Sequence, residues 1–146
     1  MATDVGTVSF TVPGDVVPWA RAGRGKGITF TPARQRNYMG VLRSAAHEAM
    51  HGMAPMTGPC RLTVTADYPW PKSTTKKRRA APDGAWKDTK PDADNITKIV
   101  KDALSGIVFV DDAQCAEIRT VKRLSDAASL RVEVTSLVGI PVEIAA

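Results

Sequence analysis

The sequence is poor in cysteine, aromatic residues and long apolar runs, and each shortage excludes a class of protein. Two cysteines, Cys60 and Cys115, stand far apart in 146 residues, which suits neither a disulfide scaffold nor the spacing of a metal site. No apolar run reaches the length of a membrane span, and no signal-peptide pattern opens the chain. We therefore expect a protein of the reduced cytoplasm with no membrane partner.

Aromatic residues make up only 5% of the chain, so base stacking is not an obvious binding strategy. The glycines between Gly23 and Gly27 lack the spacing of a nucleotide-binding loop. In contrast, 43% hydrophobic and 24% charged residues are typical of a soluble globular protein. The length suits a single domain over residues 1–146.

The positive charge is concentrated in one segment. The net charge is +5, and from Lys72 to Lys90 there are seven Lys or Arg residues against two aspartates, so this segment holds the whole excess. Such a local basic block indicates a polyanionic partner, although a solvated loop that keeps the protein soluble would look the same.

Alternating apolar and polar residues predict strands over 7–12, 61–66, 114–123 and 130–134. Helical spacing predicts one helix that starts at Thr31-Pro32 and ends before Gly52, and a second over 94–105. The fold class expected from this order is mixed α/β (α+β): a small single domain with a sheet of about four strands and two main helices.

Three connections are also predicted. The segment 69–91 has no periodicity, so we expect a long, basic, flexible loop. A second flexible basic loop runs from Pro13 to Gly27. The turn near Ser125-Asp126 is short enough to join the last two strands as an antiparallel hairpin.

Acidic residues are few, yet four of them form two pairs on either side of the second helix: Asp92 with Asp94, and Asp111 with Asp112. The connection after the helix is short enough for the chain to fold back, which predicts one carboxylate-lined pocket. Carboxylates gathered in this way favour Mg²⁺, which leaves coordination positions open for phosphate oxygens.

Each acidic residue also has a simpler interpretation. Asp94 suits the start of a helix, and Asp111-Asp112 suits an ordinary polar turn. Lys98 lies one helical turn after Asp94, where it makes either a surface ion pair or a cation beside the acidic pocket. Trp70 is expected to anchor the basic loop, whereas Trp86 could anchor it or stack on DNA.

These residues carry a resemblance to a known family. The stretch Lys90-Pro91-Asp92-Ala93-Asp94-Asn95-Ile96-Thr97-Lys98, followed by Asp102-Ala103-Leu104, Gly106, Asp111-Asp112-Ala113-Gln114 and Val121-Lys122, resembles the RusA family of Holliday-junction resolvases. These are small endonucleases of phage and prophage origin. The match covers about a quarter of the chain at the level of motifs, with a weaker likeness at Pro18-Trp19-Ala20-Arg21.

The resemblance implies a homodimer that binds four-way DNA junctions and makes paired nicks with Mg²⁺, for which Mn²⁺ would substitute. It implies that Asp92, Asp94, Asp112 and Lys98 are catalytic, and that Asp111 supports the three aspartates as a metal ligand. Together with the basic segments, it implies DNA contacts by the following cations: Arg21, Arg24, Lys26, Lys76, Lys77, Arg78, Arg79, Lys90 and Lys122.

The function expected from the sequence is therefore a metal-dependent, structure-selective DNA endonuclease of recombination and repair. The alternative is a basic nucleic-acid-binding module whose acidic cluster is only structural. A pure binder gains nothing from four acids near a polyanion, because they repel phosphate unless a metal ion intervenes.

Overall fold

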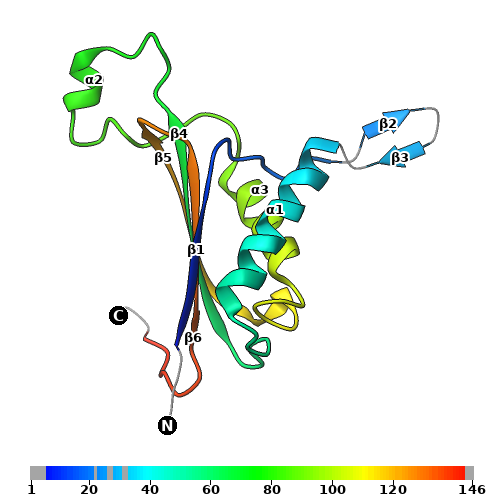
Figure 1. The fold of residues 1–146 in the computed structure, drawn as a ribbon. Helices are drawn as coiled ribbons and strands as arrows, with labels where there is room; N and C mark the ends of the chain where they lie inside the picture. The colour runs from blue at the N-terminus through cyan, green and yellow to red at the C-terminus, as the bar shows by residue number, and fades with distance from the viewer. Residues whose placement is uncertain (1–5, 22, 26–27, 31–32, 144–146) are drawn as a thin grey trace.

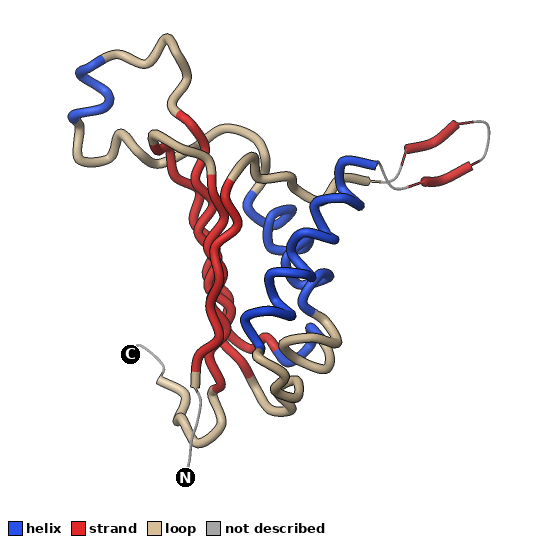
Figure 2. Tube along the Cα trace, viewed as in Figure 1, coloured by secondary structure: helices blue, strands red, loops and turns tan. Residues whose placement is uncertain are grey.

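The computed structural model describes residues 6–21, 23–25, 28–30 and 33–143. A single sheet forms one layer and two helices form the other, as Figures 1 and 2 show. The strands are β1 (Thr7–Pro13), β4 (Cys60–Pro69), β5 (Cys115–Ser125) and β6 (Ser129–Ser136), and the helices are α1 (Ala33–Met50) and α3 (Ala93–Leu104). The predicted fold class, a mixed sheet of four strands packed with two main helices, is confirmed.

The strand order is β1-β6-β4-β5, in which β4 is parallel to β5 and antiparallel to β6. The predicted hairpin between the last two strands is therefore wrong, because β4 lies between them. The side chains of Leu62, Val64 and Ala66 on β4 are fully buried, and a strand with so apolar a face is most stable at the centre of the sheet. The short turn after Ser125 crosses the end of β4 instead of closing a hairpin.

Both helices bury one apolar stripe against the same face of the sheet. Tyr38, Leu42, Ala46 and Met50 are the buried apolar positions of α1, with helical spacing. On α3 the buried residues are Ile96, Ile99, Val100, Ala103 and Leu104, which agrees with the predicted stripe. The first helix ends as expected, because His51 and Gly52 adopt positive φ angles of 49° and 78°.

Two predicted loops contain regular structure. The basic loop after β1 carries a small antiparallel hairpin of β2 (Gly23–Gly25) and β3 (Ile28–Phe30). The segment 69–91 contains the short helix α2 (Lys76–Ala80), with the Thr75 side chain accepting a hydrogen bond from the backbone of Arg78. In Figure 1 the hairpin and the α2 segment project from the same end of the molecule, on opposite sides.

No helix among the described residues is long and apolar enough to cross a membrane.

The contact between α3 and the sheet makes a prediction for stability. Ile99 is fully buried on α3, so Ile99→Ala should lower the free energy of unfolding by about 2–5 kcal/mol through the cavity it leaves. Val41→Ala, at a position 49% exposed on α1, should change it by less than about 0.5 kcal/mol. Urea unfolding followed by circular dichroism measures both values, and an equal effect of the two variants would contradict this packing.

Candidate active site

Asp92 and Asp94 lie at the N-terminal end of α3. Asp92 has the extended backbone of an N-cap residue, but its carboxylate makes no capping hydrogen bond, and its side chain is 58% exposed. Its nearest cation is Lys90, with Nζ 3.8 Å from Oδ1. Asp94 is exposed in the first turn of the same helix. The positive end of the helix dipole favours both carboxylates, and neither is used to hold the fold together.

Asp111 and Asp112 lie beyond the other end of α3. Asp111 caps a short 3₁₀ helix over Asp112–Gln114, where its Oδ1 accepts a hydrogen bond from the backbone of Ala113. The Gln114 side chain holds this turn in place, because its Nε2 donates to the carbonyls of Met56 and Gly58, at 2.8 and 2.9 Å. Asp111 therefore has a structural role, whereas Asp112 makes no side-chain contact that fixes the turn.

The two acidic pairs do not meet within one chain. The 12 residues of α3 span about 18 Å and separate the pairs along the helix axis. Figure 1 shows the segment that follows α3 at the opposite end of the sheet from the start of that helix. Within the described residues, no three His, Cys, Asp or Glu side chains form a group able to hold a metal ion. The prediction of one shared pocket is therefore wrong for a single chain, because the chain does not fold back past the helix.

Lys98 lies on the exposed side of α3, and it forms an ion pair with Asp102 instead of Asp94. Its Nζ is 3.4 Å from the Asp102 carboxylate and 5.0 Å from the centre of the Trp19 ring. The ammonium thus lies between a carboxylate and an aromatic face, on the same helix as Asp94. Its proposed catalytic role stays a prediction.

The segment of residues 18–21 is held beside the start of α3. The Trp19 amide donates to the Asn95 carbonyl at 3.0 Å, and the Ala20 amide donates to Gln35 Oε1 at 2.8 Å. Gln35 is only 4% exposed, so this buried amide fixes the path of the segment. Arg21 follows this segment and is exposed. The side chain of Arg24 and the whole of Lys26, also predicted to bind DNA, lie outside the described residues.

Lys122 has a positioning role that its place in the sequence did not reveal. Its Nζ donates to the carbonyls of Thr89 and Pro91, at 2.7 and 2.8 Å, and so ties β5 to the residues just before Asp92. Nearby, Lys87 donates to the Thr89 hydroxyl and stacks 4.9 Å from the centre of the Tyr68 ring. Burial lowers the pKa of Lys87, the Lys122 ammonium lowers it further, and Asp88 opposes the change.

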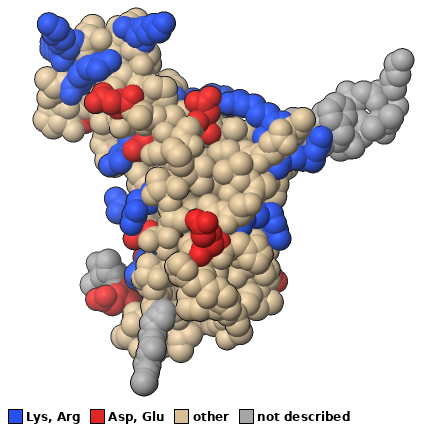
Figure 3. Space-filling view, viewed as in Figure 1, with Lys and Arg blue, Asp and Glu red and all other residues tan. Residues whose placement is uncertain are grey.

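The residues of α2 present the basic surface predicted for this segment. Figure 3 shows Lys and Arg side chains gathered over the projection that carries α2. Lys76 and Lys77 are exposed, and so is Lys90 on the approach to α3. Arg79 stacks 5.1 Å from the centre of the Trp70 ring, which joins α2 to the end of β4.

Arg78 holds the projection together. Its guanidinium donates to the carbonyls of Gly84 and Trp86, both at 3.2 Å. Gly84 is needed at this turn, because a Cβ there would collide with the Arg78 carbonyl. The loop then lies along the end of β5, where Leu124 donates to Ala85 and Lys87 donates to Lys122 through their backbones.

Trp86 lies on this loop, beside the basic surface, and is 58% exposed. A large aromatic side chain in solvent next to cations is typical of a surface that stacks on nucleic acid. Of the two interpretations that the sequence left open, the exposure favours stacking over anchoring.

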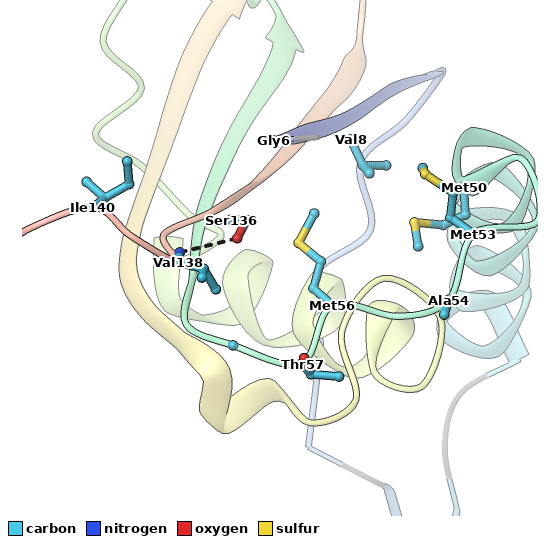
Figure 4. A pocket seen from close by; sticks show the side chains of 11 residues that line it. Gly6, Val8, Met50, Met53, Ala54, Met56, Thr57, Ser136, Val138 and Ile140 are labelled. Carbon is cyan, nitrogen blue, oxygen red and sulfur yellow. Dashed lines mark hydrogen bonds between the residues drawn. The ribbon is translucent and has the colours of Figure 1, made fainter. Parts of the chain in front are cut away.

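A cavity of about 620 Å³ lies behind the turn of Asp111 and Asp112, since Met56 and Gly58, whose carbonyls accept from Gln114, also line it. Figure 4 shows Met53, Met56 and Val138 around it, at the end of the sheet where the chain leaves β6. Its lining has no acid, base or cation, so it is unsuited to hydrolysing a phosphodiester.

Comparison with known proteins identifies the family of the chain. The chain is similar to the Bacillus subtilis (strain 168) protein YqaN, described as uncharacterized, with 33% identity over 135 residues, which covers 87% of this chain and 93% of the relative. The family pattern described as Endodeoxyribonuclease RusA matches residues 13–135, from the end of β1 to β6. This match includes both acidic pairs, Lys98 and the basic segment, and the chain belongs to the RusA endodeoxyribonuclease family.

Proposed function

We propose that this protein resolves four-way DNA junctions by paired, Mg²⁺-dependent nicks and acts as a homodimer. Membership of the RusA family indicates endodeoxyribonuclease action on Holliday junctions. The observation that carries the rest is the pair of exposed carboxylates at the start of α3, with no capping bond from Asp92, next to a strongly basic projection. Cations bring the DNA backbone to this end of the molecule, and carboxylates there suit a hard metal ion.

The separation of the acidic pairs supports the homodimer. One chain supplies Asp92 and Asp94 at one end of α3 and Asp112 beyond the other end, so the three carboxylates can share one metal ion only across two chains. We propose that Asp92 and Asp94 of one protomer and the partner's Asp112 share a metal ion, with Asp111 holding the turn. When bound, Mg²⁺, or Mn²⁺ in its place, activates water and neutralises charge on the leaving phosphate.

The remaining residues bind and position the DNA. Lys76, Lys77 and Lys90 offer exposed ammonium groups to phosphates, and Arg21 offers an exposed guanidinium. Lys98 is placed to approach a phosphate held near Asp94, since both are exposed on one helix. Lys122 and Arg78 do not approach the DNA in this proposal but position the backbone, because Lys122 donates to the Pro91 carbonyl and Arg78 donates to the Gly84 carbonyl.

The test of the activity is cleavage of a synthetic four-way junction, with a linear duplex and a single strand of the same sequence as controls. Symmetric nicks on the junction in Mg²⁺, and none in EDTA, are expected. Tight junction binding without any cleavage in Mg²⁺ or Mn²⁺ would instead support the non-catalytic binding module.

The first site prediction concerns Asp92→Asn. Loss of one metal-binding charge should lower the cleavage rate by at least ~100-fold, equivalent to about 2.7 kcal/mol of transition-state stabilisation. Junction binding in EDTA should stay equal or become tighter, because the substitution removes a charge that repels phosphate. Glu48→Gln, at an exposed acid on α1, is the control and should leave both unchanged. Near wild-type cleavage by Asp92→Asn would remove this assignment.

The shared site predicts complementation between subunits. Asp92→Asn and Asp112→Asn should each be inactive alone. After unfolding and refolding together, a mixed dimer carries one intact site, formed by the unchanged Asp92 of one chain and the unchanged Asp112 of the other. The mixture should nick junctions, with few complete resolutions, and should bind Mn²⁺ in calorimetry. If the mixture is as inactive as its components, each site lies within one chain.

The basic projection predicts a change in salt dependence. Lys76→Ala with Lys77→Ala should weaken junction binding and lower the slope of log K against log[salt] by about 1.8, as two phosphate contacts are lost. Arg131→Ala on β6 is the control and should leave the slope in place. An unaltered slope in the double variant would mean that α2 does not contact DNA.

A further inference from the structure

The three tryptophans of the chain lie in different surroundings. Trp19 and Trp70 are partly buried, and each has a cation against its ring, Lys98 at 5.0 Å and Arg79 at 5.1 Å from the ring centre. Trp86, in contrast, is 58% exposed. Exposure alone does not identify a partner, because single apolar side chains are common on protein surfaces. The backbone and the neighbours of Trp86 are more informative.

The backbone of Trp86 is fixed, although its ring lies in solvent. Its carbonyl accepts a hydrogen bond from the Arg78 guanidinium at 3.2 Å, and its amide donates to the Asp83 carbonyl at 3.3 Å. The residues on either side of it bond to the end of β5 through their own backbone groups. The loop therefore presents the ring in one place, and a ligand that stacks on it does not have to order the backbone.

A small cleft of about 210 Å³ opens beside Trp86, and its other walls are Pro82, Ala85 and Arg123. Trp86 and Arg123 are antiparallel bridge partners, so their side chains lie on the same face of the sheet. Asp67 orients the guanidinium of Arg123, because its carboxylate accepts from Nε at 2.9 Å and from Nη2 at 3.0 Å. An indole and an oriented guanidinium are the groups on which proteins stack flat rings.

The size of the cleft and the charge around it identify the occupant. Sites that enclose a whole ligand measure roughly 300–1,000 Å³, so this smaller cleft suits a single flat ring. Between Lys72 and Lys90, seven Lys or Arg residues outnumber two aspartates, and Figure 3 shows the cations gathered over the same projection. These cations attract phosphates, and an aromatic ring beside them takes a base. Only an unpaired base has a face free to stack in this way.

We propose that Trp86 and Arg123 hold one unpaired base of branched DNA, which makes Trp86 a residue that distinguishes branched from linear DNA. The inference rests on the proposed function, because it places this base near the carboxylates. Arg123 and Lys122 are neighbours on β5, so their side chains point to opposite faces of the sheet. Lys122 holds Pro91 beside Asp92 on one face, and the cleft lies on the other face at the same end of the strand.

Binding measured in EDTA tests the cleft without any cleavage. Trp86→Ala should weaken binding to a duplex that carries two bulged thymines by ~5- to ~150-fold, the range expected for one lost base–aromatic stack. Binding to a matched duplex of the same length should not change, because that contact is with phosphates. Ile140→Ala is the control, since it removes a large apolar side chain that is 56% exposed at the other end of the sheet.

Two further variants separate stacking from apolar contact. Trp86→Phe keeps a flat aromatic ring and should keep most of the preference for the bulged duplex. Trp86→Leu keeps an apolar side chain that cannot stack and should lose the preference as Trp86→Ala does. Circular dichroism verifies folding of each variant. Equal weakening on both duplexes by Trp86→Ala, equal behaviour of the Phe and Leu variants, or no preference in the wild type would overturn this role.

Cross-linking reports the contact directly. With 5-iodouracil in place of one bulged thymine, near-ultraviolet light should join the DNA to the tryptic peptide of residues 80–87, whose single aromatic residue is Trp86. Mass spectrometry identifies the peptide. Absence of this product, or a cross-link at Trp19 or Trp70 in its place, would mean that the unpaired base lies elsewhere.

Junction cleavage by the wild type separates the two proposals. If the wild type nicks junctions in Mg²⁺ while Trp86→Ala binds the bulged duplex normally, the cleft is wrong and the function stands. If Trp86→Ala loses the preference for bulged DNA while the wild type never nicks, the cleft stands and the proposed function fails.

Discussion

The parallel pairing of β4 with β5 is the constraint on which the rest of the molecule depends. Two parallel neighbours require the chain to return from the end of one strand to the beginning of the next, and α3 provides that return. Its buried stripe packs on the sheet, so its two ends are fixed at opposite ends of the strands. The acidic pairs flank this helix in sequence, and the crossover therefore holds them apart in space.

Alternation and helical spacing were sufficient to predict the main strands and helices, because each reflects burial of one face of a local segment. Strand order was not predictable in this way. A short turn after Ser125 suits a hairpin as well as a step across one strand, and the position of β4 between β5 and β6 decides between them, which no local pattern records. The available signal that this strand lies at an edge was its charged residues, such as Glu117, Arg119 and Arg123.

Sequence reasoning placed Asp92 and Asp94 correctly at the start of a helix, since capping and acidic preference are local properties. It missed the buried amide of Gln35 and the carbonyl contacts of Lys122, which join residues far apart in the chain. It also treated the four cations of α2 as equivalent. The structure distinguishes them, because Arg78 donates hydrogen bonds to two carbonyls of the loop, whereas the side chains of Lys76 and Lys77 are exposed.

Separation of the carboxylates has an electrostatic consequence. A monomer avoids the repulsion of four acids in one pocket, so its fold needs no metal ion to offset that repulsion. If two chains bring the acids together, assembly concentrates negative charge and creates the affinity for a cation in the same step. By linkage, the factor by which dimerisation strengthens metal binding is the factor by which the metal strengthens the dimer. A site built in this way becomes competent to cut only when two protomers are in place, which suits a reaction that needs two coordinated nicks.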